Sequence, residues 1–254
     1  MKLQVLGCSG GIGKGLKTTS FLVDDSLLID AGTGIELLTM NEMLTIRDVV
    51  ITHAHIDHIV GLPLMLATIF DQHTLPVRVH AIPEVVTALK EHIFNWTIWP
   101  DFTQLPKSKP IVSLHEINVG DTLSLQGKEV TVLPAVHPTP TVGYLVKDAQ
   151  SSMVFTGDSG INPELWPIIN TQKPDVLIID VSFTDEVGEL AVASGHLTPS
   201  QLASELAHVN SDAKPKVYLT HLKPGFEAQI VSECQACVDG FELDQLNHNQ
   251  TLLF

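Results

Sequence analysis

Basic residues are scarce in this 254-residue chain: lysine and arginine together number 14 against 29 acidic residues, a formal net charge of −15. Proteins that follow a nucleic acid backbone use clustered lysines and arginines to neutralise its phosphates. The acidic balance therefore counts against a long nucleic acid as a partner. It does not exclude a small anionic ligand, because a bound divalent cation would dominate the field within its own site.

Long apolar runs and cysteines are also scarce. No apolar run approaches the roughly 20 residues of a membrane-spanning helix, and the segment before Cys8 is too short for a signal peptide, so we expect no membrane partner. Three cysteines are too few for a disulfide framework. Cys234 and Cys237 form an isolated C-x-x-C, which we interpret as two ordinary thiols, with a redox or metal pair as the alternative. Together these features predict a cytoplasmic protein.

Hydrophobic residues, by contrast, make up 44% of the chain, enough for a substantial core in a single domain spanning 1–254. Short β-branched or aliphatic runs recur, each ending in turn or polar residues, as is typical of strands. Helical patterns lie between some of them, at 57–72, 83–94, 162–170, 198–209 and 225–238. This order predicts an α+β fold, an αββα sandwich in which two packed mixed β-sheets are flanked by helices.

A glycine-rich stretch follows the first predicted strand. Its spacing fits neither G-x-G-x-x-G nor G-x-x-x-x-G-K-[ST], the two phosphate-binding patterns that follow a strand. We interpret it as a flexible turn that lines the mouth of a site, because glycine permits close approach of backbone to a ligand. Its members are Gly7, Gly10, Gly11, Gly13 and Gly15.

The densest chemical feature directly follows an apolar strand that ends at Ile51. Three imidazoles and one carboxylate stand within six positions, in the pattern H-x-H-x-D-H formed by His53, His55, Asp57 and His58. Two histidines one residue apart on an extended segment point the same way, so His53 and His55 can hold one ion. Asp57 and His58 then turn toward a neighbouring position. The alternative is a turn with surface histidines, but this density favours a metal site.

This pattern resembles the signature of the metallo-β-lactamase superfamily, and four further segments match in the expected order. Asp30 in LLIDAGTG resembles the strand-end aspartate that supports the metal loop, and His137 in LPAVHPTP resembles the third ligand of the first metal. Asp158 in FTGD resembles the carboxylate shared by both ions, and His221 in YLTHLKP resembles the last ligand of the second. The resemblance covers most of the chain.

By this resemblance the site holds two divalent metal ions, with zinc the first choice and manganese or iron also compatible with such ligands. The implied ligands are His53, His55 and His137 for the first ion, Asp57, His58 and His221 for the second, and Asp158 for both. Asp30 is the candidate for fixing a ligand ring from behind, with a structural turn as its alternative. Hydrolysis is the implied reaction, because a water between two divalent cations loses a proton near neutral pH.

The segment SGHLTP, from Ser194 to Pro199, resembles class II 3′,5′-cyclic-nucleotide phosphodiesterases. By resemblance, His196 would polarise a phosphate oxygen or protonate the departing ribose O3′ while a metal-bridging hydroxide attacks phosphorus. Asp57 and His196 are therefore the expected catalytic residues, with helix-start capping as the alternative for His196. The chain departs from that class at Ile56, where we expect leucine, and in lacking a serine in the following helix.

The resulting expectation is a dimetal phosphodiesterase that opens a small-molecule cyclic nucleotide, cAMP or cGMP, to the 5′-monophosphate and forms a homodimer. One alternative keeps the metals and changes the substrate: a tRNA 3′-endonuclease, a cyclic-phosphate esterase, or a thioester or lactone hydrolase. The acidic balance counts against the endonuclease. A third class, a metal-binding module without hydrolytic activity, would resemble the flavin-coupled di-iron relatives.

Four aromatic residues gather between positions 94 and 102. One of them could stack on a nucleobase while Asn95 or Asp101 reads its edge, although packing against the core or a partner is the commoner fate of such residues. The remaining histidines receive no role: His73, His80, His92, His115, His208 and His248.

Overall fold

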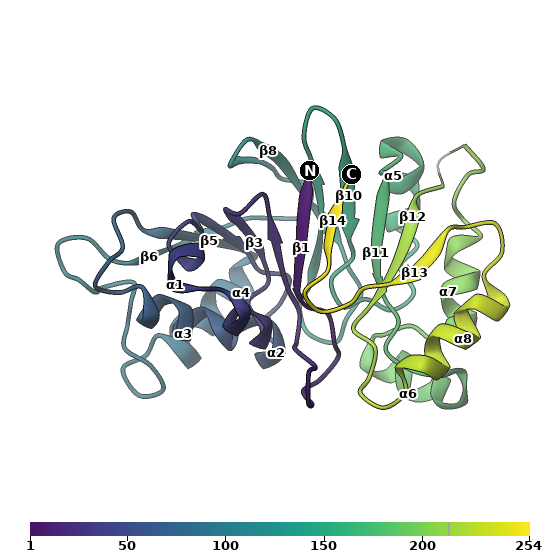
Figure 1. Cartoon of the computed structure of the whole chain (residues 1–254), viewed down its shortest axis with the longest axis horizontal. Helices are drawn as coiled ribbons and strands as arrows, with labels where there is room; N and C mark the ends of the chain where they lie inside the picture. The colour runs from purple at the N-terminus through teal and green to yellow at the C-terminus, as the bar shows by residue number, and fades with distance from the viewer. Residues whose placement is uncertain (213) are drawn as a thin grey trace.

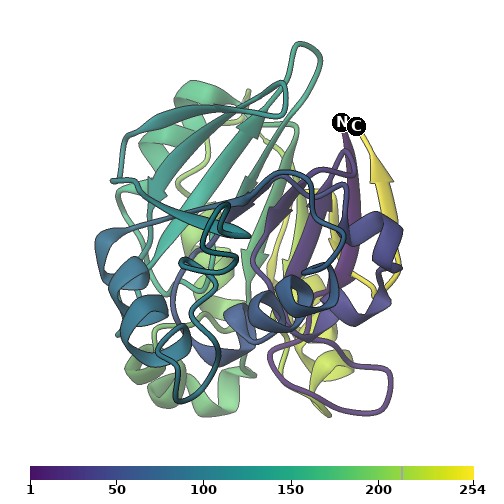
Figure 2. The ribbon, with the colours of Figure 1, turned by 90° about the vertical axis from the view of Figure 1, so that its left-hand side faces the viewer.

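Two seven-stranded sheets pack face to face in the computed structural model, which describes residues 1–212 and 214–254. Figure 1 shows helices on the two outer flanks, α1 to α4 beside the first sheet and α5 to α8 beside the second. Figure 2 shows the purple strands of the first sheet next to the green strands of the second. The predicted αββα sandwich of two mixed sheets is confirmed.

The first sheet has the strand order β14-β1-β2-β3-β4-β5-β6. Its strands β14, β1, β2 and β3 pair antiparallel, whereas β3, β4, β5 and β6 pair parallel. The bounds are β1 (Lys2–Gly7), β2 (Ser20–Val23), β3 (Leu27–Ile29), β4 (Asp48–Val50), β5 (Val77–Ala81), β6 (Val112–Glu116) and β14 (Thr251–Leu253).

The second sheet has the order β13-β12-β11-β10-β9-β8-β7, with parallel pairing from β10 to β13 and antiparallel pairing from β7 to β10. Its bounds are β7 (Thr122–Leu125), β8 (Lys128–Pro134), β9 (Val142–Lys147), β10 (Ser152–Phe155), β11 (Val176–Asp180), β12 (Lys216–Thr220) and β13 (Leu243–Gln245). Parallel strands end at one edge of a sheet, so loops after β10, β11 and β12 can meet there.

The helices lie mainly in the connections between parallel strands, as such crossovers require. Those before β6 are η1 (Thr33–Leu37), α1 (Met40–Met43), α2 (Ile56–Ile59), α3 (Gly61–Thr68), α4 (Pro83–Ala88) and the π-helical turn η2 (Leu89–Ile93). Those after β10 are α5 (Leu165–Gln172), η3 (Asp185–Val187), α6 (Gly188–Ser194), α7 (Pro199–Leu206) and α8 (Glu227–Cys237). None of the described helices is long and apolar enough to cross a membrane.

The helix predicted at 57–72 is two helices, because the chain turns closely around Gly61. The Gly61 amide donates to the carbonyl oxygen of Ala31 at 2.7 Å. A Cβ added at Gly61 would lie 2.4 Å from the Gly32 carbonyl oxygen. Only glycine allows this approach, and the bond to Ala31 replaces a bond within the helix at this point.

The core between the sheets also holds the segment that carries this motif. The rings of Phe21 and Phe155, one from each sheet, meet edge to face with centroids 5.0 Å apart. The buried Tyr144 hydroxyl on β9 donates to the carbonyl oxygen of Ile51 at 2.7 Å. A buried aromatic residue contributes roughly 2 to 3 kcal/mol through burial, and here the Tyr144 hydroxyl also fixes the start of the motif loop.

Candidate metal centre

The histidine motif begins at the end of β4 and runs into α2. His53 and His58 are fully buried, whereas His55 and Asp57 are more exposed. The ring of His53 lies between its neighbours, 4.6 Å from the His55 centroid and 4.2 Å from that of His58. The extended backbone at His55 (φ −62°, ψ 144°) ends the strand-like segment and begins the helix. The predicted change of direction after His55 therefore occurs.

Asp30, at the end of β3, supports two of these rings. Its carboxylate accepts from Nδ1 of His58 at 2.8 Å and from the Thr52 hydroxyl at 2.8 Å. That hydroxyl in turn accepts from Nδ1 of His53 at 3.0 Å. With Nδ1 used in this way, both histidines present Nε2 to the site. The interpretation of Asp30 as a support for the metal loop is confirmed by these contacts.

His137 and Asp158 come from the second sheet, after β8 and β10. Nδ1 of His137 donates to the Gly195 carbonyl oxygen at 3.0 Å, which turns its Nε2 toward Nδ1 of His55, 3.4 Å away. Oδ2 of Asp158 lies 3.6 Å from Nε2 of His53 and 3.4 Å from Nε2 of His58. Asp158 is thus central to the cluster, as a shared ligand must be.

His221 follows β12 and adopts a left-handed backbone conformation (φ 62°). Its Nε2 lies 3.3 Å from Oδ2 of Asp158 and 3.4 Å from Oδ2 of Asp57. The glycine-rich stretch packs directly on it, because a Cβ added at Gly10 would lie 2.3 Å from the His221 carbonyl oxygen. The predicted position of this stretch beside the site is therefore correct.

His196 lies just before α7, where Thr198, Pro199 and the Gln201 side chain form the predicted helix start. Its Nδ1 lies 2.6 Å from Oδ2 of Asp180, and its ring stacks on that of His221 at 5.2 Å and 15°. Since a carboxylate only accepts hydrogen bonds, Nδ1 of His196 carries a proton and Nε2 is left for the site.

Asp180 and Ser182 are functional neighbours that sequence reasoning missed. The Ser182 hydroxyl donates to Oδ1 of Asp180 at 2.7 Å and accepts from Nδ1 of His221 at 2.9 Å. One carboxylate therefore orients both His196 and, through Ser182, His221. The only signal in the sequence was that Asp180 ends the apolar run VLIID. Asp30 and the motif loop also directly follow apolar runs.

The donor set fits divalent metal ions. Ligand atoms within 4.8 Å of one another form three overlapping groups: His53, His55, His137 and Asp158; Asp57, His58 and His221; and Asp158, His196 and His221. Nε2 of His53 and of His58 are buried with no hydrogen-bond partner among the described residues. Unpaired buried nitrogens are costly unless a ligand binds them. Imidazole nitrogens with carboxylate oxygens are ligands typical of zinc, manganese and iron.

The pKa shifts of His53 and Asp158 favour the forms of these two groups that bind metal. Burial, with the charge of His58, holds the pKa of His53 well below its usual value, so this ring is neutral. Burial raises the pKa of Asp158, but the charges of His221 and His58 lower it by more. The net result is a pKa well below the usual value. Neutral imidazoles and an ionised carboxylate are the forms that coordinate metals. His58 differs: burial lowers its pKa, but the charges of Asp158 and Asp30 raise it to well above its usual value, so a metal would displace a proton there.

The aromatic segment from 94 to 102 divides its side chains between core and solvent. Phe94 and Phe102 are buried, whereas Trp96 is 60% exposed. The Asn95 side chain accepts from the backbone of residues 97 and 98, and the Asp101 carboxylate accepts from Thr103 and Gln104. Asn95 and Asp101 are thus occupied with local turns, which argues against their reading a nucleobase.

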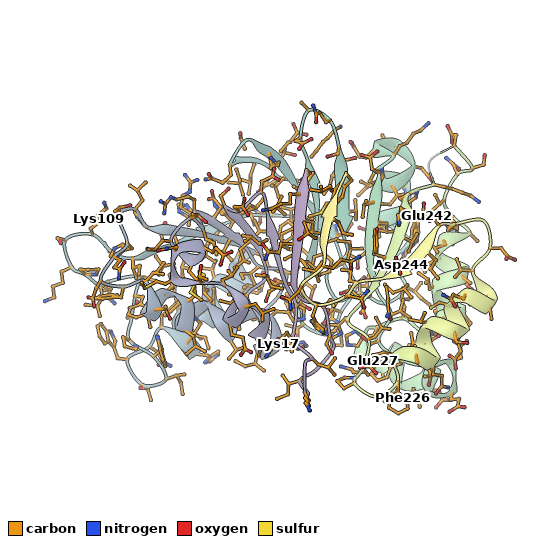
Figure 3. The ribbon with its side chains drawn as sticks, in the orientation of Figure 1. Lys17, Lys109, Phe226, Glu227, Glu242 and Asp244 are labelled. Carbon is orange, nitrogen blue, oxygen red and sulfur yellow. The ribbon has the colours of Figure 1, made fainter. Side chains whose placement is uncertain are left out.

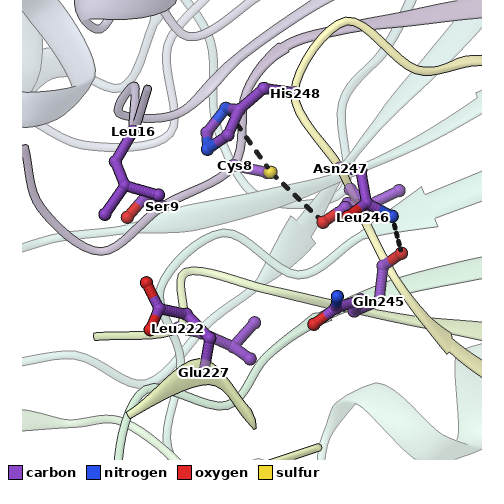
Figure 4. Close-up of a pocket in the computed structure, with 9 residues that line it drawn as sticks. All are labelled: Cys8, Ser9, Leu16, Leu222, Glu227, Gln245, Leu246, Asn247 and His248. Carbon is purple, nitrogen blue, oxygen red and sulfur yellow. Dashed lines mark hydrogen bonds between the residues drawn. The ribbon is translucent and has the colours of Figure 1, made fainter. Parts of the chain in front are cut away.

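A small cavity of about 190 Å³ lies beside the glycine-rich stretch, with Cys8, Ser9 and Leu16 in its lining (Figure 4). The Cys8 thiol donates to the Leu246 carbonyl oxygen at 3.4 Å and lies 3.9 Å from Nδ1 of His248. Burial raises the pKa of this thiol to about 12, so it stays protonated and unreactive. The other two cysteines, Cys234 and Cys237, are free thiols on α8.

Two packed mixed sheets that hold a histidine and aspartate cluster at their shared edge define a metal-binding hydrolase of the αββα class. Residues 26–222 match the model of a family described as the beta-lactamase superfamily domain. The chain belongs to this superfamily. The matched range contains every predicted metal ligand.

The relatives divide between two activities. The chain is 24% identical to a probable 3′,5′-cyclic-nucleotide phosphodiesterase of Yersinia pestis, covering 89% of this chain and 79% of the relative. It is 22% identical to ribonuclease BN of Cronobacter sakazakii, covering 96% and 97%. The crystal structure of unliganded yeast PDE1 superposes with a TM-score of 0.84 at 18% identity, over 100% of this chain and 99% of that one. The family and its resemblance to these phosphodiesterases are thus confirmed.

Proposed function

We propose that this protein hydrolyses 3′,5′-cyclic nucleotides to 5′-monophosphates at a dinuclear centre, most simply with zinc. The proposed ligands are those of the sequence analysis: His53, His55, Asp57, His58, His137, Asp158 and His221. Two divalent ions held by these residues would supply Lewis acidity and a water of lowered pKa. We retain the cytoplasm as the expected compartment and a homodimer as the expected assembly.

The observation that carries the proposal is the buried pair of Asp180 and His196 beside the ligand cluster. Burial lowers the pKa of His196, but the charge and hydrogen bond of Asp180 raise it by more, so the net shift is upward. A histidine that keeps its proton near neutral pH is suited to donate it to a leaving oxygen. His196 would thus protonate O3′ as the P–O3′ bond breaks.

Asp57 would have two roles. It is the least buried carboxylate of the cluster, and its Oδ2 lies 3.4 Å from Nε2 of His221. Burial raises the pKa of Asp57, but the hydrogen bond from His221 and the charge of His58 lower it more, so the carboxylate is ionised. An ionised carboxylate at the mouth of the cluster can serve as a ligand and can accept a hydrogen bond from the attacking water, which would orient that water.

An apolar cavity of about 390 Å³ beside His196 suits the part of the substrate that does not react. The Phe183 ring contacts His196 edge to face with centroids 5.7 Å apart, and Nζ of Lys223 lies 5.5 Å above the Phe183 ring. Val187 and Phe226, which is labelled in Figure 3, are 40% and 53% exposed on its rim. Aromatic and apolar walls of this kind favour a planar base.

The second candidate is a tRNA 3′-endonuclease, favoured by the match to ribonuclease BN over nearly the whole of both chains. Charge argues against it: with 14 basic against 29 acidic residues, the chain has few positive charges to contact tRNA phosphates, and its net charge of −15 repels them. The proposed chemistry is shared, so only the substrate separates the two candidates.

The experiment compares zinc-loaded and manganese-loaded protein on cAMP, cGMP, bis(p-nitrophenyl) phosphate and a precursor tRNA, with bound metal counted in parallel. Selective turnover of a cyclic nucleotide with two metals per chain is the expected result. Selective cleavage of the precursor tRNA would replace the proposal by the endonuclease. Full metal occupancy with no activity on any of the four would overturn phosphodiester hydrolysis altogether.

A further inference from the structure

Both arginines of the chain, Arg47 and Arg78, line one cavity that contains none of the proposed metal ligands. Its volume is about 470 Å³, within the range of small-molecule sites. The lining residues are Arg47, Leu75, Pro76, Arg78, Ser113, His115 and Gln126, and no acidic side chain is among them. In a chain of net charge −15, this concentration of positive charge is unexpected. We call this cavity the arginine cleft.

The arginine cleft opens between the two sheets, near the starts of the parallel strands rather than at their ends. Arg47 precedes β4, and Arg78 pairs with Ser113 across β5 and β6. Gln126 comes from the turn between β7 and β8 of the second sheet. Figure 1 shows β5, β6 and β8 on the same side of the molecule. The motif loop lies beyond the opposite end of β4, so the cleft is separate from the metal centre.

A buried carboxylate fixes Arg78 in place. Oδ1 of Asp48 accepts from Nε of Arg78 and Oδ2 from Nη2, both at 2.7 Å. The same carboxylate accepts from His80 at 2.8 Å and from Gln126 at 2.7 Å. This network joins the two sheets and accounts for Arg78 structurally. It also leaves Nη1 of Arg78, on a side chain 46% exposed, with no partner among the described residues.

Arg47 has no such structural explanation. Its side chain is half-buried, yet among the described residues its guanidinium forms neither an ion pair nor a hydrogen bond. A guanidinium presents several donors in a planar fork that matches phosphate oxygens. Ser113 and His115, joined by a 2.9 Å hydrogen bond, add polar groups to the wall, while Leu75, which is 53% exposed, adds an apolar one.

We propose that the arginine cleft binds a phosphate monoester of a small organic molecule. The phosphate would contact the guanidinium groups of Arg47 and Arg78, and the organic part would pack on Leu75 and Pro76. Arg78 is already oriented by Asp48, so little side-chain freedom is lost on binding there. The proposal does not depend on the reaction catalysed at the metal centre.

The test uses phenyl phosphate as the probe and calorimetric titration of metal-loaded protein, with the heats fitted to two sites because the proposed metal centre also binds phosphate groups. Arg47→Met keeps an unbranched side chain about as long as the arginine stem and removes the guanidinium group. Lys147→Met removes the same charge at an exposed position with no ion pair among the described residues. We expect Arg47→Met to weaken binding by about tenfold or more, the loss of one charge-assisted contact. Lys147→Met should bind as the wild type does.

A second variant tests whether the loss of binding comes from the cleft itself rather than from the change in the net charge of the protein. Ser113→Leu keeps both arginines and fills the cleft, and it should also weaken binding at least tenfold. A third, His55→Ala, disrupts the metal centre and should retain binding in the cleft. Unchanged binding in Arg47→Met or in Ser113→Leu, or complete loss in His55→Ala, would overturn the proposal. Turnover at the metal centre should stay unchanged in Arg47→Met, so the two proposals fail separately.

Discussion

Nδ1 of His196 lies 2.6 Å from Oδ2 of Asp180, and both side chains are buried beside the ligand cluster. The carboxylate fixes the tautomer of His196 and stabilises its protonated form, as is usual when a carboxylate backs a catalytic histidine. Through Ser182 the same carboxylate also orients His221. A proposed proton donor and a proposed metal ligand thus depend on one residue.

Asp180→Asn should therefore lower kcat for cAMP by about 10²-fold, the usual contribution of a general acid. The effect should depend on the leaving group. Hydrolysis of bis(p-nitrophenyl) phosphate should change far less, because p-nitrophenolate leaves without protonation. A merely structural defect, or loss of metal through His221, would lower both rates together. The measurement is therefore the ratio of the two rates, with bound metal counted in parallel.

His196→Ala and His55→Ala should fail in different ways. His196→Ala should retain both metals and lose most cleavage of cyclic nucleotides. His55→Ala should lose metal and all turnover, because a proposed ligand is removed. Metal content by elemental analysis, measured beside kcat, separates the two variants. A His196→Ala protein with the full wild-type rate would contradict its role as the acid.

Asp30→Asn should weaken metal binding by roughly 10- to 100-fold, as expected when a residue that supports metal ligands is altered. Asp30 has a left-handed backbone (φ 55°), which asparagine tolerates. The substitution therefore removes the charge that holds His53 and His58 without straining the chain. Competition with a chelator measures the change; unchanged affinity would mean that Asp30 supports only the fold.

The lowered pKa of Asp48 should make the free energy of unfolding depend on pH. Burial raises the pKa of this carboxyl, but hydrogen bonds from His80, Arg78 and Gln126 lower it more, to well below its usual value of 3.8. The stabilisation is therefore present above pH 3.8 and declines as the pH falls below it. Asp48→Asn should cost about 1.5 to 3 kcal/mol at pH 7, the usual contribution of hydrogen bonds to a charged group.

Urea unfolding of the wild type and of Asp48→Asn between pH 7 and pH 3 measures this. The difference in the free energy of unfolding should be constant down to about pH 4 and shrink below it. A difference that is independent of pH over the whole range would show that the charge of Asp48 contributes nothing.

The sequence predicts which residues cluster at the site because most of the signal of the proposed ligands is local. Four of them stand within six positions, and His137, Asp158 and His221 each end an apolar run. Asp180 ends such a run too, but nothing local separates it from an ordinary strand-end aspartate. Its function arises from β11 lying next to β10 and β12, which only the tertiary structure brings together.

The fold class was predictable for a similar reason, since strand and helix periods are local. The break at Gly61 was not, because it depends on contact with Ala31 and Gly32, some thirty positions earlier. The helix α6 was also missed. Val187, Leu190 and Val192 are exposed there, so its apolar residues do not form the one-sided pattern by which a helix is recognised.

Hydrolysis of 3′,5′-cAMP in ¹⁸O-labelled water, followed by phosphorus NMR on protein with two metals bound, tests the central proposal most directly. We predict 5′-AMP that carries one ¹⁸O on phosphorus, because water attacks phosphorus and the bond to O3′ breaks. Formation of 3′-AMP, or no hydrolysis despite full metal occupancy, would contradict it.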